Sequence, residues 1–325
     1  MSSGLSLQWK EALALSRRQA PEFYEPGADI APGPHAEAIR FALSDLGLAG
    51  VFCIEGVPTI AFLHEEGQVP ERIDRAHRIL WNQGLMSLLL VIRDDELLAY
   101  SLVHRPFARD PNQTSDPRLI ETLRLVADGL KLRELIDSAE SGRFWLAHDA
   151  HFDPAQRVDT VLLNNLIAAF NALKSDLGAD GAQALLIQSM FIAYLEDRKI
   201  VRAERFLAVS NDACASFEQV LASRSTAPFE ALFAWLKDAF NGDVFLAPCA
   251  FELRKTKPPK VKPSHLKVLG EFRHGKVEMA TGQFRFLGYD FEFMPIALIN
   301  HTWHGKPFDG ITGPMDILTP RFHRH

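Results

Sequence analysis

The stretch HRILWNQGLMSLLLVIRDDELLAYSL, residues 77–102, decides the fold of the first part of this chain. It begins inside a helix expected over about Val69 to Gln83, which a glycine ends. Leu88 to Ile92 is a nearly continuous apolar run, which predicts a strand buried on both faces. Asp94-Asp95 predicts a turn, and Leu97 to Leu102 predicts the next strand.

The same alternation of helix and strands occurs once more upstream. His35 to Leu46 places apolar side chains on one helical face. Val51 to Ile54 and Val57 to Leu63 predict two strands around a tight turn at Glu55-Gly56, because glycine takes positive φ freely. The order helix, two strands, helix, two strands predicts a small mixed α/β domain over residues 1–107.

Length and composition describe an ordinary soluble, intracellular protein of two domains or one large one. Of the 325 residues, 47 % are hydrophobic and 23 % are charged. The net charge of −6 gives no global sign of nucleic-acid binding, so such a contact must come from a local patch. Three scattered cysteines argue against a zinc site or a disulfide framework and indicate a reducing cytoplasm. The longest apolar run, Leu85 to Ile92, is far too short to span a membrane.

The small α/β domain raises the hypothesis of a PD-(D/E)xK nuclease. That chemistry needs an acidic residue on one strand and a (D/E)xK triplet on the next, which together hold Mg²⁺ and orient a water. Ala61-Phe62-Leu63 stands where the triplet is needed, and Glu55 is the lone candidate acid. Asp197-Arg198-Lys199 has the right spacing but ends a helical pattern. We therefore expect a degenerate, structural version of this scaffold; the alternative is a Mg²⁺-dependent nuclease that uses Glu55.

After a polar, proline-bearing linker at residues 108–118, the apolar period changes to that of helices. Leu119, Leu123, Val126 and Leu130 share one predicted helical face. A long helix is expected after Asp153-Pro154, and Gly178 and Gly181 separate it from another over Ala182 to Glu196. The pattern predicts a helical connector domain over residues 119–310, followed by a tail at 311–325.

A basic stretch, RKTKPPKVKPSHLK, occupies residues 254–267 and contains six basic residues and no acidic one. Its three prolines predict an extended conformation. The stretch is either a solvated surface loop or a phosphate-contacting loop, because lysines on an extended chain can follow a nucleic-acid backbone without reading its sequence. The candidate nucleic-acid-binding residues are Arg254, Lys255, Lys257, Lys260, Lys262 and Lys267.

An aromatic stretch, FRFLGYDFEFMPIALINHTW, occupies residues 284–303 near the end of the sequence. Its aromatic residues alternate with polar ones, which predicts a short strand with one aromatic face. Pro295 suits the first turn of a helix, and Ile296, Ile299 and Trp303 follow at helical spacing. The expected class is therefore α+β, with a mainly helical second domain that carries a short aromatic β element.

Four phrases in this order resemble one family of proteins. They are HRILWNQG (77–84) before the strand LLLVI and a strand ending Tyr100-Ser101, FIAYLEDR (191–198), FNGDVF (240–245) and YDFEFMPI (289–296). The series is similar to the N-terminal half of the large, Eco57I-like N6-adenine DNA methyltransferases of type IIG restriction–modification and related phage-defence systems. The resemblance covers about residues 40 to 305. It implies a nuclease-like domain joined by a helical body to a Rossmann-like methyltransferase domain, which binds S-adenosylmethionine and holds the flipped adenine in an NPPY-type pocket.

The sequence departs from the family's catalytic pattern. Its only Pro-Pro is Pro258-Pro259, with no Asn/Asp-Pro-Pro-Tyr, and it has no glycine-rich loop suited to S-adenosylmethionine. Thr319-Pro320-Arg321-Phe322 resembles a remnant of the entry to the missing methyltransferase domain. We therefore predict no catalytic, cofactor-binding or metal-binding residue.

The leading hypothesis is a non-catalytic, DNA-associated module of a restriction–modification or phage-defence system, which positions DNA or a partner methyltransferase. The first alternative is the Mg²⁺-dependent nuclease. The second is a protein–protein module without DNA binding, whose interface is an apolar patch around Phe291, Phe293 and Trp303.

Overall fold

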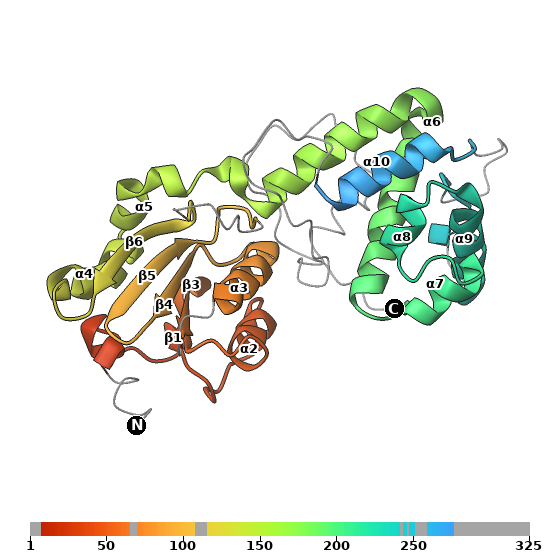
Figure 1. The fold of residues 1–325 in the computed structure, drawn as a ribbon. Helices are drawn as coiled ribbons and strands as arrows, with labels where there is room; N and C mark the ends of the chain where they lie inside the picture. Colours follow the sequence, from red (N-terminus) through yellow and green to blue (C-terminus); the bar gives the residue numbers. More distant parts are fainter. Residues whose placement is uncertain are drawn as a thin grey trace. The chain divides into compact units, whose positions relative to one another are not determined.

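The computed structural model describes residues 8–65, 70–107, 116–240, 243–245, 247–250 and 259–275. The chain divides into two compact units, Met1–Thr160 and Val161–His325, which we take one at a time. The first unit holds a mixed β-sheet and the second is helical, which confirms the predicted α+β class (Figure 1). The predicted aromatic strand and helix at 284–303 lie outside the described residues, as does the tail at 311–325.

The first unit is built on one sheet with the strand order β1-β2-β3-β4-β5-β6. Only β3 and β4 pair in parallel, through the crossover helix α3, and the other neighbours are antiparallel. The elements of this unit are β1 (Phe23–Tyr24), α2 (Ala36–Ser44), β2 (Gly50–Ile54), β3 (Val57–His64), α3 (Pro70–Gln83), β4 (Leu88–Ile92), β5 (Glu96–Ser101), β6 (Leu119–Arg124), α4 (Gly129–Glu140) and α5 (Arg143–Ala147). The predicted hairpin turn is confirmed, because Glu55 and Gly56 both have positive φ, at 51° and 80°.

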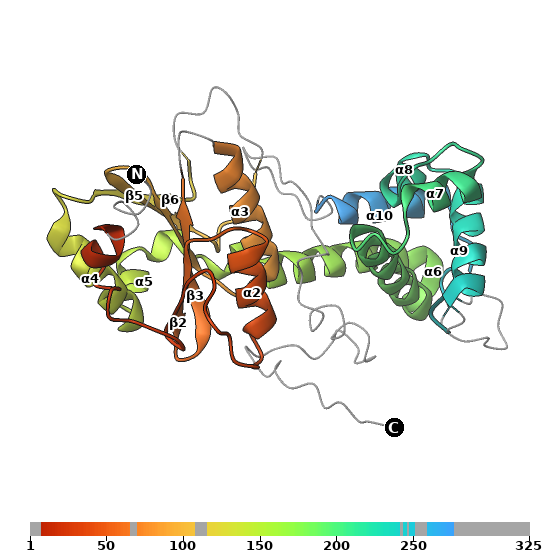
Figure 2. The ribbon, with the colours of Figure 1, turned by 90° about the horizontal axis from the view of Figure 1, so that it is seen from below.

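Helices cover both faces of the sheet, with α2 and α3 on one side and α4 and α5 on the other (Figure 2). The side chains of β4 alternate between the two cores: Leu90 packs in the cluster with α4, and Leu89 packs in the cluster with α2 and α3. Every residue of β4 is buried, so the prediction of a strand buried on both faces is confirmed.

The prediction of a helix beginning at Leu119 is wrong, because Leu119–Arg124 is strand β6 and pairs with β5. Leu123 lies opposite Leu97 and is buried in the sheet's core, whereas Val126 is 88 % exposed and Leu130 is 73 % exposed. Sheet pairing has overridden an apolar spacing that looks helical. The first unit therefore continues to Thr160, beyond the predicted boundary at residue 107, and the strands on either side of the predicted linker, β5 and β6, pair in the same sheet.

Arg118, at the end of that predicted linker, is almost completely buried, with 1 % of its surface exposed. Its guanidinium donates to Asp116 through Nε and Nη2, at 2.9 Å and 2.7 Å, and to Asp74 at 2.6 Å. The same guanidinium lies 4.7 Å from the centre of the Phe107 ring. Arg118 thus holds both flanks of residues 108–115 through charge-assisted hydrogen bonds and a cation–π contact.

His77 of α3 is fully buried next to this cluster. Its Nε2 donates to the carbonyl of Ser101 at 2.9 Å, while its Nδ1 has no hydrogen-bond partner among the described residues. Burial, and then the positive charge of Arg118, lower the pKa of His77 to about 3. The ring is therefore neutral, with its proton on Nε2.

The second unit consists of helices around the long helix α6. Its elements are α6 (Val158–Asp197), α7 (Ala203–Ser210), α8 (Phe217–Ala222), α9 (Thr226–Phe240), the 3₁₀ turn η3 (Asp243–Phe245) and α10 (Pro263–Arg273). The predicted interruption of α6 is confirmed at Gly178, whose φ of 71° and ψ of 170° are not helical, while Gly181 remains inside a helix. No described helix is both long enough and apolar enough to cross a membrane.

Candidate nucleic-acid interface

The structure describes three of the six predicted phosphate-binding residues, Lys260, Lys262 and Lys267. The other three, Arg254, Lys255 and Lys257, lie outside the described residues. The expected extended conformation is wrong at the C-terminal end of the stretch, because helix α10 begins at Pro263 and contains Lys267. Proline suits this first helical position, since its missing N–H is not needed there. Pro263, one of the three prolines on which the prediction of an extended chain rests, is therefore the first residue of a helix.

Gln188 of α6 holds the chain that precedes the basic stretch. Its side chain is buried, and its Nε2 lies 2.7 Å from the carbonyl oxygen of Val244 and 2.9 Å from those of Ala247 and Ala250. Its Oε1 accepts a hydrogen bond from the N–H of Cys249 at 3.1 Å. The two N–H groups of this amide are thus shared among three carbonyl oxygens, and its oxygen accepts from Cys249, which ties residues 244, 247, 249 and 250 to α6.

Asp176 of α6 holds the chain that follows. Its Oδ2 accepts from Lys262 Nζ at 2.9 Å and from His265 Nε2 at 3.1 Å. The N–H of Lys262 donates in turn to Nδ1 of His265, so the ring of His265 caps the start of α10. The hydrogen bond from Lys262, followed by that from His265, lowers the pKa of the Asp176 carboxyl.

The chain before residue 251 and the chain after residue 258 both pass next to Gly181 of α6. A Cβ at this glycine would lie 3.1 Å from Pro259 Cγ and 3.7 Å from Cys249 Cβ. Residues on both sides of 251–258 therefore contact the same position of α6. We call this arrangement of Cys249 and Pro259 at Gly181 the neck of the basic stretch.

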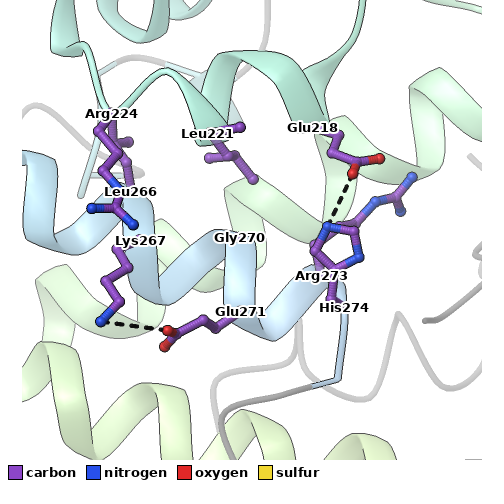
Figure 3. A pocket seen from close by; sticks show the side chains of 10 residues that line it. Glu218, Leu221, Arg224, Leu266, Lys267, Gly270, Glu271, Arg273 and His274 are labelled. Atoms are coloured by element: carbon purple, nitrogen blue, oxygen red, sulfur yellow. Dashed lines mark ion pairs between the residues drawn. The ribbon is translucent and has the colours of Figure 1, made fainter. Parts of the chain in front are cut away.

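Lys267 also lines a groove of about 240 Å³ between α8 and α10, which we call the α8–α10 groove (Figure 3). Its floor includes Leu221 of α8 and Leu266 and Gly270 of α10. Gly270 faces α8, and a Cβ there would lie at an ordinary contact distance of 3.8 Å from Leu221 Cβ. Lys267 Nζ lies 3.6 Å from Glu271, a long ion pair.

The groove has two ends of different character. At one end, His274 binds Glu218 at 3.1 Å (Figure 3). Arg273, at the same end, binds Asp197 at 2.7 Å. At the other end lies Arg224, whose exposed side chain forms no ion pair or side-chain hydrogen bond within the described part of the chain. Only this second end therefore presents a cation that is not already paired.

The residues of the nuclease hypothesis belong to different units of the chain. Glu55 is exposed at the tip of the β2–β3 hairpin, whereas Asp197 of the DxK triplet is used in the ion pair with Arg273 in the other unit. Ala61-Phe62-Leu63 is fully buried in the sheet. Across the described ranges, no group of three His, Cys, Asp or Glu residues is arranged to hold a metal ion.

A second hollow, of about 380 Å³, is lined by charges of both signs where α6 ends and α7 begins. Glu196, on its edge, accepts from the N–H of Phe217 at 2.8 Å, and burial raises the pKa of this carboxyl. Glu196 therefore supports the start of α8.

Sequence reasoning missed Gln188, Asp176, Gly181 and Arg224. Lys262 and Asp176 are 86 residues apart, and Cys249 and Gln188 are 61 apart, so no local pattern connects them. Arg224 has a positive φ of 52°, but nothing in its sequence neighbours distinguishes it from other exposed arginines.

Comparison with known proteins returned no relatives for this chain. No protein-family model matches it, and neither a curated protein nor a solved structure matches it.

Proposed function

We propose that this protein is a non-catalytic, DNA-associated module of a restriction–modification or phage-defence methyltransferase system. In this proposal the basic stretch at 254–267 contacts DNA phosphates and so positions DNA, or a partner methyltransferase on it. The observation that carries the proposal is the neck, because residues on both sides of 251–258 are held against α6 close to its interruption at Gly178. A cationic segment held in this way loses less conformational entropy on binding than a free one.

The local charge supports the same proposal. Residues 254–276 contain one acidic residue, Glu271, in a chain whose net charge is −6. Their basic residues are Arg254, Lys255, Lys257, Lys260, Lys262, Lys267, Arg273 and Lys276. Lysine contacts to phosphates release counterions, so binding of this kind is sequence-independent and weakens steeply with salt.

The choice of DNA, among polyanions, rests on the resemblance to the N-terminal half of adenine methyltransferases. The proposal puts the protein in the cytoplasm. Its three cysteines are buried and free, as expected in a reducing compartment.

The test is a fluorescence-anisotropy titration of a duplex of about 30 base pairs with the full-length protein between 50 and 200 mM salt. The variant carries Lys257→Glu and Lys260→Glu, which leaves the Lys262 contact with Asp176 intact. We expect its affinity to fall at least tenfold and its salt slope to fall by roughly two, since each lost phosphate contact removes about 0.9.

The matched control carries Lys174→Glu and Lys237→Glu, two exposed lysines on α6 and α9. It makes the same change in net charge and should retain most of the affinity. Equal losses in the two variants would mean that only total charge matters, and the basic stretch would then have no special role.

The non-catalytic part of the proposal needs its own measurement. Supercoiled plasmid incubated with the protein and Mg²⁺ or Mn²⁺ should remain uncut. Cleavage that disappears in Glu55→Ala would establish the nuclease alternative instead.

A further inference from the structure

The α8–α10 groove presents a cationic end formed by Arg224 and Lys267 (Figure 3). We infer that this end binds a phosphate of the DNA backbone and extends the contact made by the basic stretch, so that Arg224 is a further nucleic-acid-binding residue. The inference rests on the proposed function and names a second part of the same interface.

Helix α10 joins the basic stretch to the groove. Lys262 caps its start and Lys267 lies five residues further on, which is about 7.5 Å along the axis of an α-helix. That length corresponds to about two nucleotide steps of one DNA strand. Side chains at these two positions of α10 can therefore meet phosphates about two steps apart on a strand that leaves the neck along this helix.

Arg224 has the chemistry that phosphate binding needs. Its planar guanidinium can donate two parallel hydrogen bonds to one phosphate, which an ammonium group cannot do. By contrast, Arg273 in the same groove is already bound to Asp197 at 2.7 Å. Recruiting Arg273 would break an existing ion pair, whereas recruiting Arg224 breaks none among the described residues.

Glu271 opposes an anion at this end. It lies 3.6 Å from Lys267 and is partly exposed, so it would compete with a phosphate for that ammonium group. Its removal provides a test that a purely structural role does not mimic. A variant that merely destabilises the fold cannot bind DNA more tightly.

The experiment repeats the salt titration with Arg224→Gln and with Glu271→Gln. Arg224→Gln should lower the magnitude of the salt slope by about 0.9, one phosphate contact, with a severalfold loss of affinity at low salt. Glu271→Gln should bind the duplex severalfold more tightly. The matched controls are Lys237→Gln and Glu230→Gln on α9, both exposed, which should leave the slope unchanged.

The outcomes separate this inference from the proposed function. A wild-type protein that binds no duplex at low salt overturns both. A second outcome is that the wild type binds, the Lys257→Glu, Lys260→Glu variant loses affinity, and Arg224→Gln keeps the full salt slope. That outcome leaves the proposed function standing and overturns the inference. Weaker binding by Glu271→Gln also overturns it.

Discussion

Different kinds of side chain hold the residues on either side of two segments, 108–115 in the first unit and 251–258 in the second. In the first unit a buried cation, Arg118, contacts Phe107 and Asp116 on the two flanks. In the second unit the buried neutral amide of Gln188 holds one flank, and an exposed ion pair between Asp176 and Lys262 holds the other.

The difference separates charge that stabilises the fold from charge that is available for binding. The guanidinium of Arg118 is neutralised by two carboxylates inside the protein, so it cannot act on a ligand. Lys260 and Lys267 are exposed and are not enclosed in this way, so they can still contact a phosphate. The burial of Arg118 and the exposure of Lys260 and Lys267 therefore distinguish the basic residues next to the two segments.

The largest effect should come from Arg118→Met. The change removes the shared partner of Asp74 and Asp116 near the core, and breaking such a buried pair costs about 3–5 kcal/mol. Urea unfolding of the first unit, followed by tryptophan fluorescence, measures the loss. DNA affinity under native conditions should not change. A change in affinity would contradict the conclusion that Arg118 serves the fold and not binding.

Gln188→Leu should have the next largest effect. It removes the two hydrogen bonds that the amide can donate and the one that it accepts, and each buried group left unsatisfied costs about 1–3 kcal/mol before relaxation, so we expect a net loss of about 3 kcal/mol. Unlike Arg118→Met, this variant should also weaken DNA binding, because the flank of the basic stretch is released. Full affinity at a temperature where the variant is folded would show that the neck does not matter for binding.

The stability of the first unit should depend on pH through His77. Its pKa is about 3 in the folded protein, and an unfolded histidine titrates near 6.5, so between these values the unfolded state binds more protons. Stability therefore falls as the pH drops from about 6.5 towards 3, by about 2 kcal/mol at pH 4.5 once partial relaxation is allowed for.

The comparison of wild type with His77→Gln isolates this contribution from the other titrating groups. The glutamine can still donate to the carbonyl of Ser101, so its stability should depend less on pH. Parallel pH curves for the two proteins would contradict the assignment.

The smallest effect distinguishes two glycines in helices of the second unit. Glycine to alanine in a helix contributes about 1 kcal/mol of stability where space allows. Gly270→Ala should gain most of this, because its new Cβ would lie at an ordinary 3.8 Å from Leu221. Gly181→Ala should gain less or lose stability, because its Cβ would lie 3.1 Å from Pro259. Equal melting temperatures of the two variants would show that the neck is loosely packed.

Much of the first unit could be predicted from local patterns. The buried strand β4, the hairpin turn at Glu55-Gly56 and the helix α3 follow from apolar runs and glycine positions. Strand β6 could not, because its apolar spacing suits a helix and only pairing with β5 makes it a strand. Of the candidate site, the basic charge was evident in the sequence, but the start of α10 at Pro263 was not.

The sequence by itself determined the α+β class, the strand and helix order from α2 to β5, and the concentration of basic residues at 254–267. These features depend on side-chain period and turn chemistry over a few neighbouring residues. Tertiary structure alone decided that Arg118 is buried, that Gln188 and Asp176 hold the flanks of the basic stretch, and that Arg224 lines the groove with Lys267. Those contacts join residues tens of positions apart, and only the packing of whole helices and strands brings them within hydrogen-bonding distance.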